Sequence, residues 1–218
     1  MTNRILILGA SGHIAHFAIE KLLKSTDDHL VLFTRHPQSL AKMDPDRTII
    51  FECDTLSPDD LAQAMDNVNI VYANLSNPDI QQQAANIVTT MDQHKIKPLI
   101  WISSIGIYDD VPGKFGEWNN AMLRKGGKNS YLGTYRAADD VIEQSDLDYT
   151  IIRLAWLTNK DEVIYETTEK GEPFKGTEVS RRSIGYLVAD ITQDLQKCVH
   201  RSIGVDKPGI DGDKPSWY

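Results

Sequence analysis

The sequence predicts an α/β fold built on a doubly wound parallel sheet. Short apolar runs alternate with amphipathic stretches of helical length, and the connections between them are short. The apolar runs are fewer than the eight that a closed barrel of alternating strands and helices needs. A length of 218 residues, 41% of them hydrophobic and 25% charged, suits one globular domain with a buried core.

The predicted strands are continuous apolar runs rich in Ile, Leu and Val. This composition is typical of strands that are buried on both faces, as in parallel sheets covered by helices. The runs lie at residues 4–8, 30–34, 48–52, 69–73, 98–103 and 149–154.

Helices are expected between these strands because apolar residues recur there at helical spacing. Ile14, Ala18 and Leu22 fall on one face of a helix over residues 14–23. Ser57 and Pro58 open another helix as its N-cap and first helical residue. Further helices are predicted over residues 79–94, 129–144 and 181–197.

Two stretches, residues 109–130 and 159–180, carry no readable motif. The tail from residue 206 is rich in Pro, Gly and Asp, which favours irregular structure, although Trp217 and Tyr218 offer rings that can dock on the domain. A substrate pocket would be formed by the two stretches 109–130 and 159–180, so the sequence does not identify the substrate.

Charge and cysteine content exclude several classes of protein. A formal net charge of −8 argues against a general nucleic-acid binder, which needs a basic face. Cys53 and Cys198 lie far apart without metal-ligand spacing, so we expect neither a disulfide framework nor a metal site. The first apolar run is too short for a signal peptide or membrane span, so we expect a cytoplasmic protein without a membrane partner.

The sharpest motif is GASGHIA, residues 9–15, placed directly between the first strand and the first helix. Gly9 permits a tight turn, Gly12 permits close approach of a pyrophosphate to the backbone, and Ala15 replaces the usual third glycine. The free amides and positive end of the helix stabilise the bound anion. The predicted cofactor-binding residues of this turn are Gly9, Ser11, Gly12, His13 and Ile14.

The end of the second strand favours NADP(H) over NAD(H). An NAD site usually carries an acid about 20 residues after the glycines, but no carboxylate lies between Asp28 and Asp44. Arg35 stands there instead, preceded by Thr34, and a guanidinium binds a 2′-phosphate through paired, charge-assisted hydrogen bonds. A solvated surface arginine is the alternative.

Residues after the third and fourth strands complete the predicted cofactor site. Asp54 either accepts a hydrogen bond from the adenine amino group or caps a turn. Asn74 and Leu75 are expected beside the ribose, because ligands bind at the carboxyl ends of parallel strands. We therefore expect a single Rossmann-type domain over residues 1–218, with a cofactor-binding core over 1–155. The substrate-side segment, final helix and tail follow over residues 156–218.

Several of these motifs together resemble the atypical short-chain dehydrogenase/reductase superfamily. They are GASGHIA, Arg35, CDTL at residues 53–56 and WISSIGIY at residues 101–108. The segment 139–154, ending LDYTIIRL, is similar to that of NmrA-like and NAD(P)H-binding members. The resemblance covers about residues 3–155, and more weakly extends to about 195. It implies hydride chemistry by a Ser after the fifth strand and a Tyr-x-x-x-Lys pair on the next helix.

Carried onto this chain, the resemblance assigns Ser104 to orienting the substrate oxygen and Tyr131 to acid–base chemistry, with Ser103 beside the cofactor. Tyr135 stands where the lysine is expected. A neutral phenol cannot supply the positive field that lowers the tyrosine pKa from its reference of about 10. Arg136 is the next residue, but it is rotated by about 100° around the helix. Alternatively, both tyrosines simply pack the helix against the sheet.

These features are compatible with three functions. The leading hypothesis is an NADP(H)-dependent oxidoreductase of the atypical short-chain type acting on a small carbonyl, quinone or similar acceptor. The second, motivated by Tyr135, is a non-catalytic NADP(H)-binding regulator or sensor resembling NmrA-like proteins, with no small-molecule substrate. A sugar-nucleotide epimerase is less favoured because its substrate lobe is larger than residues 155–218. A homo-oligomer is compatible with the fold, and the sequence leaves the oligomeric state open.

Overall fold

The structure of the protein is a computed structural model that describes residues 2–40, 43–76 and 78–218. Its centre is an eight-stranded sheet in the order β3-β2-β1-β4-β5-β6-β10-β8. Neighbouring strands are parallel except at the edge, where β8 runs antiparallel to β10. The order 3-2-1-4-5-6 is that of doubly wound dinucleotide-binding sheets, so the predicted fold class is confirmed.

Each predicted strand is present, and its ends fall within one residue of the prediction. The short strands β7 and β9 pair parallel with each other in a separate two-stranded sheet. The strands are β1 (Arg4–Leu8), β2 (His29–Thr34), β3 (Thr48–Glu52), β4 (Ile70–Ala73), β5 (Pro98–Ser104), β6 (Asp148–Leu154), β7 (Trp156–Thr158), β8 (Glu166–Thr168), β9 (Glu178–Ser180) and β10 (Arg201–Asp206).

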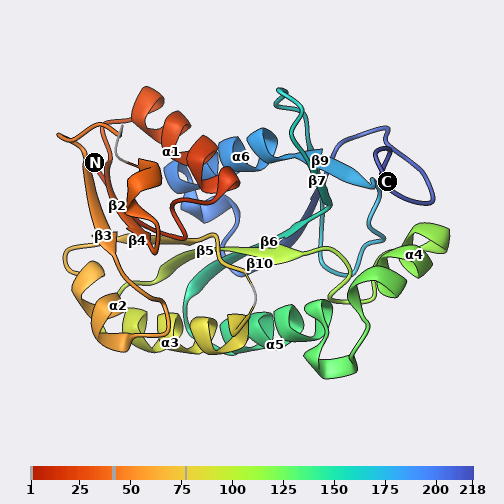
Figure 1. Cartoon of the computed structure of the whole chain (residues 1–218), viewed down its shortest axis with the longest axis horizontal. Helices are drawn as coiled ribbons and strands as arrows, with labels where there is room; N and C mark the ends of the chain where they lie inside the picture. The colour runs from red at the N-terminus through yellow and green to blue at the C-terminus, as the bar shows by residue number, and fades with distance from the viewer. Residues whose placement is uncertain (1, 41–42, 77) are drawn as a thin grey trace.

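Helices cover both faces of the large sheet. Figure 1 shows α1 and α6 on one face and α2, α3 and α5 on the other, and each face has its own buried hydrophobic cluster. The helices are α1 (His13–Ser25), α2 (Pro58–Ala64), α3 (Ile80–Gln93), α4 (Gly113–Leu123), α5 (Tyr131–Glu143) and α6 (Arg181–Gln193).

Side-chain caps explain several helix starts. The Ser57 hydroxyl accepts a hydrogen bond from the Asp60 amide at the start of α2, as predicted. Ser130 caps α5 in the same way, so this helix begins later than the prediction. At the other end, α6 stops at Gln193 because Asp194 has a non-helical backbone, and only a 3₁₀ turn follows over Leu195–Lys197.

The sequence analysis missed α4 and the four strands that follow β6. The helix α4 has few buried residues and no side-chain cap, so its pattern is weak. In β10, Gly204 breaks the apolar pattern, yet a Cβ there would lie 2.5 Å from the Phe174 ring. Tertiary packing therefore requires a glycine in this strand, and that glycine weakens the apolar pattern by which the strand could have been predicted.

The C-terminal tail is docked on the domain beside α4 (Figure 1). The Tyr218 ring lies 4.8 Å from that of Trp118, and the Trp217 ring lies 6.1 Å from that of Trp156. The backbone amide and hydroxyl of Ser216 both donate to a buried Glu178 carboxylate. The sequence left open whether the tail docks, and the structure shows that its two terminal aromatic residues do. Across the described chain, no helix combines the length and apolar character needed to span a membrane.

Candidate functional site

The glycine turn between β1 and α1 has the geometry that a phosphate-binding loop requires. Gly9 has a φ of +75°, and a Cβ there would lie 2.3 Å from the Asn74 carbonyl oxygen. The amides of Gly9 and Ala10 donate to the Phe33 carbonyl, which fixes the turn against β2. Gly12 caps α1 without a side-chain hydrogen bond, so its first amides remain open to an anion.

Gly12 also has a role that the sequence analysis did not identify. A Cβ at Gly12 would lie 2.3 Å from the Asn74 side-chain nitrogen. This glycine therefore allows Asn74, at the end of β4, to pack against the turn. Ala15, at the place of the third glycine, is fully buried.

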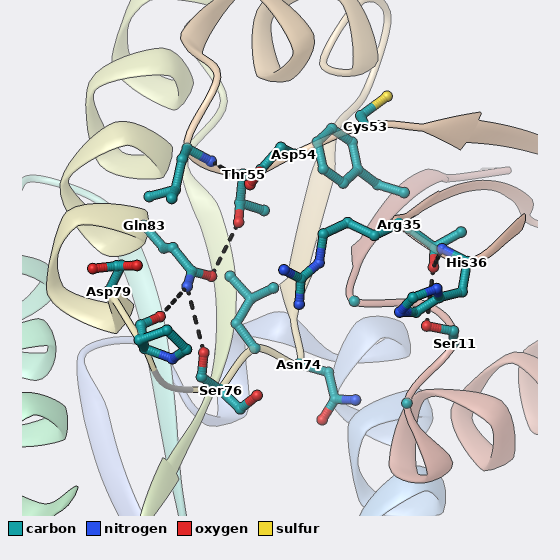
Figure 2. Close-up of a pocket in the computed structure, with 17 residues that line it drawn as sticks. Ser11, Arg35, His36, Cys53, Asp54, Thr55, Asn74, Ser76, Asp79 and Gln83 are labelled. Carbon is teal, nitrogen blue, oxygen red and sulfur yellow. Dashed lines mark hydrogen bonds between the residues drawn. The ribbon is translucent and has the colours of Figure 1, made fainter.

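A cavity of about 210 Å³ opens beside this turn at the carboxyl ends of β1, β2, β3 and β4. Figure 2 shows its side chains converging from these strand ends and from the start of α3. Predicted residues that line it include Gly9, Ser11, Gly12, Thr34, Arg35, Asp54, Asn74 and Leu75. The tertiary structure thus brings most of the predicted cofactor-binding residues together.

Arg35 follows β2, and its exposed side chain reaches into this cavity. In Figure 2 its guanidinium points between the Thr55–Gln83 side of the pocket and the Ser11–His36 side. Arg35 forms no ion pair with any carboxylate of the described residues. An unneutralised guanidinium is thus available to an anionic ligand at this end of the cavity.

Thr34 is buried, and its hydroxyl is engaged within the protein. It donates to the Ser11 hydroxyl at 2.9 Å and accepts from the His36 amide at 3.0 Å. These bonds join the end of β2 to the glycine turn. Thr34 therefore holds the shape of the pocket, while the Ser11 hydroxyl keeps its own proton for a ligand.

Asp54 caps a turn, which is one of the two roles predicted for it. Its Oδ1 accepts the Leu56 amide at 3.0 Å, which caps the turn after β3. Its side chain also lines the cavity, so the adenine role stays a prediction.

A polar network missed by the sequence analysis forms one wall of this cavity. The buried Thr55 hydroxyl donates to Gln83 Oε1 at 3.0 Å, and Gln83 Nε2 donates to the Pro78 carbonyl at 2.8 Å (Figure 2). Gln83 lies on the buried face of α3, next to Ala84. A glutamine on the mostly apolar buried face of α3 is the sequence signal that could have indicated such a network.

A second, larger cavity of about 470 Å³ lies beyond the first. Asn74, Leu75 and Ser76 line both cavities, so the two form adjoining parts of one groove. Predicted residues that line the second cavity are Ile14, Ser103, Ser104 and Tyr131. His13 lines neither of the two cavities and is exposed at the start of α1.

The two serines at the end of β5 differ in their hydrogen bonds. Ser103 Oγ donates at 2.7 Å to the fully buried Asp139 of α5, whose other oxygen accepts from the Trp101 indole. Ser104 Oγ makes only a long bond of 3.4 Å to the Ile105 carbonyl. The Ser104 hydroxyl is therefore less firmly held than that of Ser103, and its predicted role toward a substrate oxygen stays a prediction.

Tyr131 and Tyr135 are one turn apart on α5, with ring centroids separated by 4.6 Å. Tyr135 is buried in the core, and its hydroxyl donates to the Leu75 carbonyl at 3.2 Å. Tyr131 is 40% exposed and lines the cavity. Helix-to-sheet packing thus accounts for Tyr135 but leaves Tyr131 available to a ligand.

Within the described residues, no lysine or other cation lowers the pKa of these two tyrosines. Burial raises the pKa of Tyr131, and it raises that of Tyr135 further. Arg136 turns away: its guanidinium pairs with Asp140 at 2.5 Å and stacks over the Tyr108 ring. Both phenols are therefore protonated at neutral pH.

Comparisons with known proteins agree with this geometry. A family model described as NAD(P)H-binding matches residues 9–195. The chain is similar to a Rossmann-fold NAD(P)-binding family protein from Shigella flexneri, with 38% identity over 99% of this chain and 98% of that one and a TM-score of 0.83. A comparison with curated proteins found no match.

Two further structures extend the comparison. One is a short-chain dehydrogenase/reductase (wide type) from Veillonella parvula DSM 2008 in complex with NADP, with 31% identity, a TM-score of 0.88, and coverage of 99% of this chain and 100% of that one. The other, ChuY, an anaerobillin reductase from Escherichia coli O157:H7, has 14% identity, a TM-score of 0.80, and coverage of 96% and 99%. At that identity it shows a shared fold alone.

Proposed function

Because this chain belongs to the NAD(P)H-binding family, we propose that it is an NADP(H)-dependent oxidoreductase of the atypical short-chain type. Its acceptor is a small carbonyl, quinone or similar compound. The observation that supports this most directly is the groove formed by the two adjoining cavities. It leads from the glycine turn and Arg35 to Ser104 and Tyr131, the order in which an extended dinucleotide presents its phosphates and its reactive ring.

The first cavity fits the adenosine and phosphate half of NADP(H). The uncapped start of α1 and the glycines of the turn suit the diphosphate. Arg35, without an ion-pair partner in the described chain, suits the 2′-phosphate. The NADP complex of the Veillonella parvula relative supports this choice of cofactor.

The second cavity would hold the nicotinamide, which supplies a hydride when bound, together with the acceptor. In the proposed reaction the acceptor takes a hydride from NADPH and a proton from Tyr131 or solvent, and NADP⁺ is released. Ser104 would donate a hydrogen bond to the acceptor oxygen and orient it. Tyr131 carries a proton at neutral pH, and burial raises its pKa further, so it can donate this proton only to an acceptor oxygen that gains strong negative charge.

The direction of the reaction follows from the tyrosine environment. Oxidising an alcohol needs a base, but the described lining of the second cavity contains no lysine, and Arg181, which does line it, is not among the groups that shift the pKa of Tyr131. A raised pKa of Tyr131 also makes it a weak acid. Reduction of a conjugated acceptor such as a quinone is therefore favoured, because such an acceptor delocalises the charge that the hydride brings.

A non-catalytic NADP(H)-binding regulator is the second candidate function. It is favoured by Tyr135, which fills the lysine position and bonds to the Leu75 backbone in the core. In such a protein the same groove would bind the cofactor, and the second cavity would hold no acceptor.

Turnover separates the two functions. NADPH consumption is followed by absorbance with a panel of quinones and simple ketones, for the wild type, Tyr131→Phe and Ser104→Ala. We expect quinone turnover above that of ketones, and a loss of about tenfold or more in ketone turnover for Tyr131→Phe. Saturable NADPH binding with no turnover above the Tyr131→Phe, Ser104→Ala double variant would support the regulator. Absence of binding to either nicotinamide cofactor would contradict both.

A further inference from the structure

The second cavity has a chemical character of its own. Aliphatic and aromatic side chains form most of its wall, including Trp156, Leu157 and Trp217. Among its described lining residues, Arg181 is the only one that is charged at neutral pH. A single cation in an apolar pocket selects a ligand strongly, because an unpaired charge there is poorly solvated.

Arg181 is positioned by the small β7–β9 sheet. Ser180 ends β9 opposite Thr158 of β7, and Arg181 follows as the first residue of α6. Its Nη1 donates to the Asn159 side-chain oxygen at 2.8 Å, which orients the guanidinium. The side chain is half-buried, and this burial lowers the Arg181 pKa, which indicates incomplete solvation of its charge.

Neighbouring cations are neutralised, whereas Arg181 is not. Arg182 pairs with Asp161 and lies near Glu20, and Lys160 pairs with Glu178. Arg181 has no carboxylate partner among the described residues, although the chain has an excess of acidic groups. Its charge is therefore left available for a ligand.

The aromatic residues define the shape of that ligand. The Trp156 and Trp217 rings are 6.1 Å apart at an interplanar angle of 57°, and both line the cavity. Ser216 donates two hydrogen bonds to the buried Glu178. These bonds hold the neighbouring Trp217 in place, although half of this tryptophan is exposed. Such rings favour stacking with a flat, unsaturated molecule.

We infer that Arg181 forms an anion-binding subsite, and that the acceptor is a flat, apolar molecule carrying an acidic group such as a carboxylate or sulfonate. This inference rests on the proposed function for the identity of the ligand as acceptor. The cofactor diphosphate is a second possible anion. It is less favoured because Gly9, Ser11 and Gly12 of the glycine turn line the first cavity, whereas Ile14 alone of the turn lines the second cavity with Arg181.

The test measures binding without turnover. The probes are 2-naphthoate and its neutral methyl ester, bound to the full chain in the presence of NADP⁺ and followed by tryptophan fluorescence. We expect the wild type to bind the carboxylate at least tenfold more tightly than the ester. Arg181→Met should abolish this preference, Arg181→Lys should keep part of it, and Arg182→Met, the matched control on the same helix, should retain it.

Other outcomes would overturn the inference. Equal binding of the two probes by the wild type would show that no anion subsite operates. Loss of preference in Arg182→Met would indicate a diffuse surface effect. A tenfold weakening of NADPH binding by Arg181→Met would assign the guanidinium to the cofactor. Because the assay reads binding, a protein that prefers the carboxylate but turns over no acceptor would contradict the proposed enzyme and leave the subsite intact.

Discussion

Replacement of Asp139 by Asn should alter how the stability of the protein depends on pH. Asp139 is fully buried on α5, where it accepts hydrogen bonds from Trp101 Nε1 at 2.9 Å and Ser103 Oγ at 2.7 Å. Burial raises the pKa of this carboxyl to about 7, although the two hydrogen bonds oppose the shift. The folded state therefore holds a proton at Asp139 that the unfolded chain releases at much lower pH.

The sign and size of the effect follow from this difference. A pKa raised on folding contributes stability that is fully present below the unfolded pKa of about 4 and is lost as pH rises through about 7. The interval between the two pKa values sets the contribution of Asp139 to the free energy of unfolding at no more than about 4 kcal/mol. Asparagine cannot titrate, so Asp139→Asn should remove this component, although it also exchanges one acceptor for a donor.

Urea unfolding of the wild type and Asp139→Asn between pH 4 and 8 provides the assay. The free energy of unfolding of the wild type is subtracted from that of the variant at each pH, so that contributions of other titrating groups cancel. This difference should increase in favour of the variant as pH rises. Asp146→Asn is the control, because Asp146 is exposed and a hydrogen bond from Lys97 lowers its pKa below the usual value. Its stability contribution is lost only as pH falls below about 4, so the difference between this variant and the wild type should stay nearly constant between about pH 5 and 8. Parallel stability curves for wild type and Asp139→Asn would refute the reasoning.

Three further predictions concern the cofactor site and the fold. Arg35→Ala should weaken NADPH binding by about tenfold or more while leaving NADH nearly unchanged, since it removes charge-assisted bonds to the 2′-phosphate; calorimetry showing equal losses would contradict that role. Gly9→Ala should cost more than about 2 kcal/mol in urea unfolding, because its positive φ is strained and its Cβ meets the Asn74 carbonyl. Gly171→Ala is the control, because Gly171 also has a positive φ but a Cβ there would meet no atom within 4 Å. An equal loss of stability in the two variants would show that the clash with Asn74 contributes nothing. Ser57→Ala should cost about 1 kcal/mol through the lost α2 cap, measured by thermal melting, and an unchanged Tm would argue against it.

The cofactor half of the groove could be predicted from the sequence because its residues lie in short local motifs. A strand, a glycine turn and a helix start are adjacent in the chain, so residues 9–15 identify the loop without distant contacts. Arg35 could be placed because parallel strands all end at one edge of the sheet. Larger shifts of boundaries occur where local detail decides them, as at the Ser130 cap of α5 and at the non-helical backbone of Asp194 after α6.

The acceptor half could not be predicted in the same way. Trp156, Arg181 and Trp217 come from β7, α6 and the tail, and no periodic pattern links them. The side-chain bonds that separate Ser103 from Ser104 also depend on the distant Asp139. The sequence explains Gly12 by the approach of a pyrophosphate, but not by its second role, since the Asn74 side chain that also requires glycine there follows another strand.

The chain by itself therefore determined the alternation of strands and helices, the phosphate turn and the arginine that follows β2. These depend on hydrophobic periodicity and on backbone conformations that a few consecutive residues impose. Tertiary structure alone decided that Tyr135 is buried while Tyr131 stays exposed in the cavity that both line, and which of Arg181 and Arg182 keeps its charge unpaired. Such outcomes depend on the neighbours that packing supplies, and those neighbours are distant in sequence.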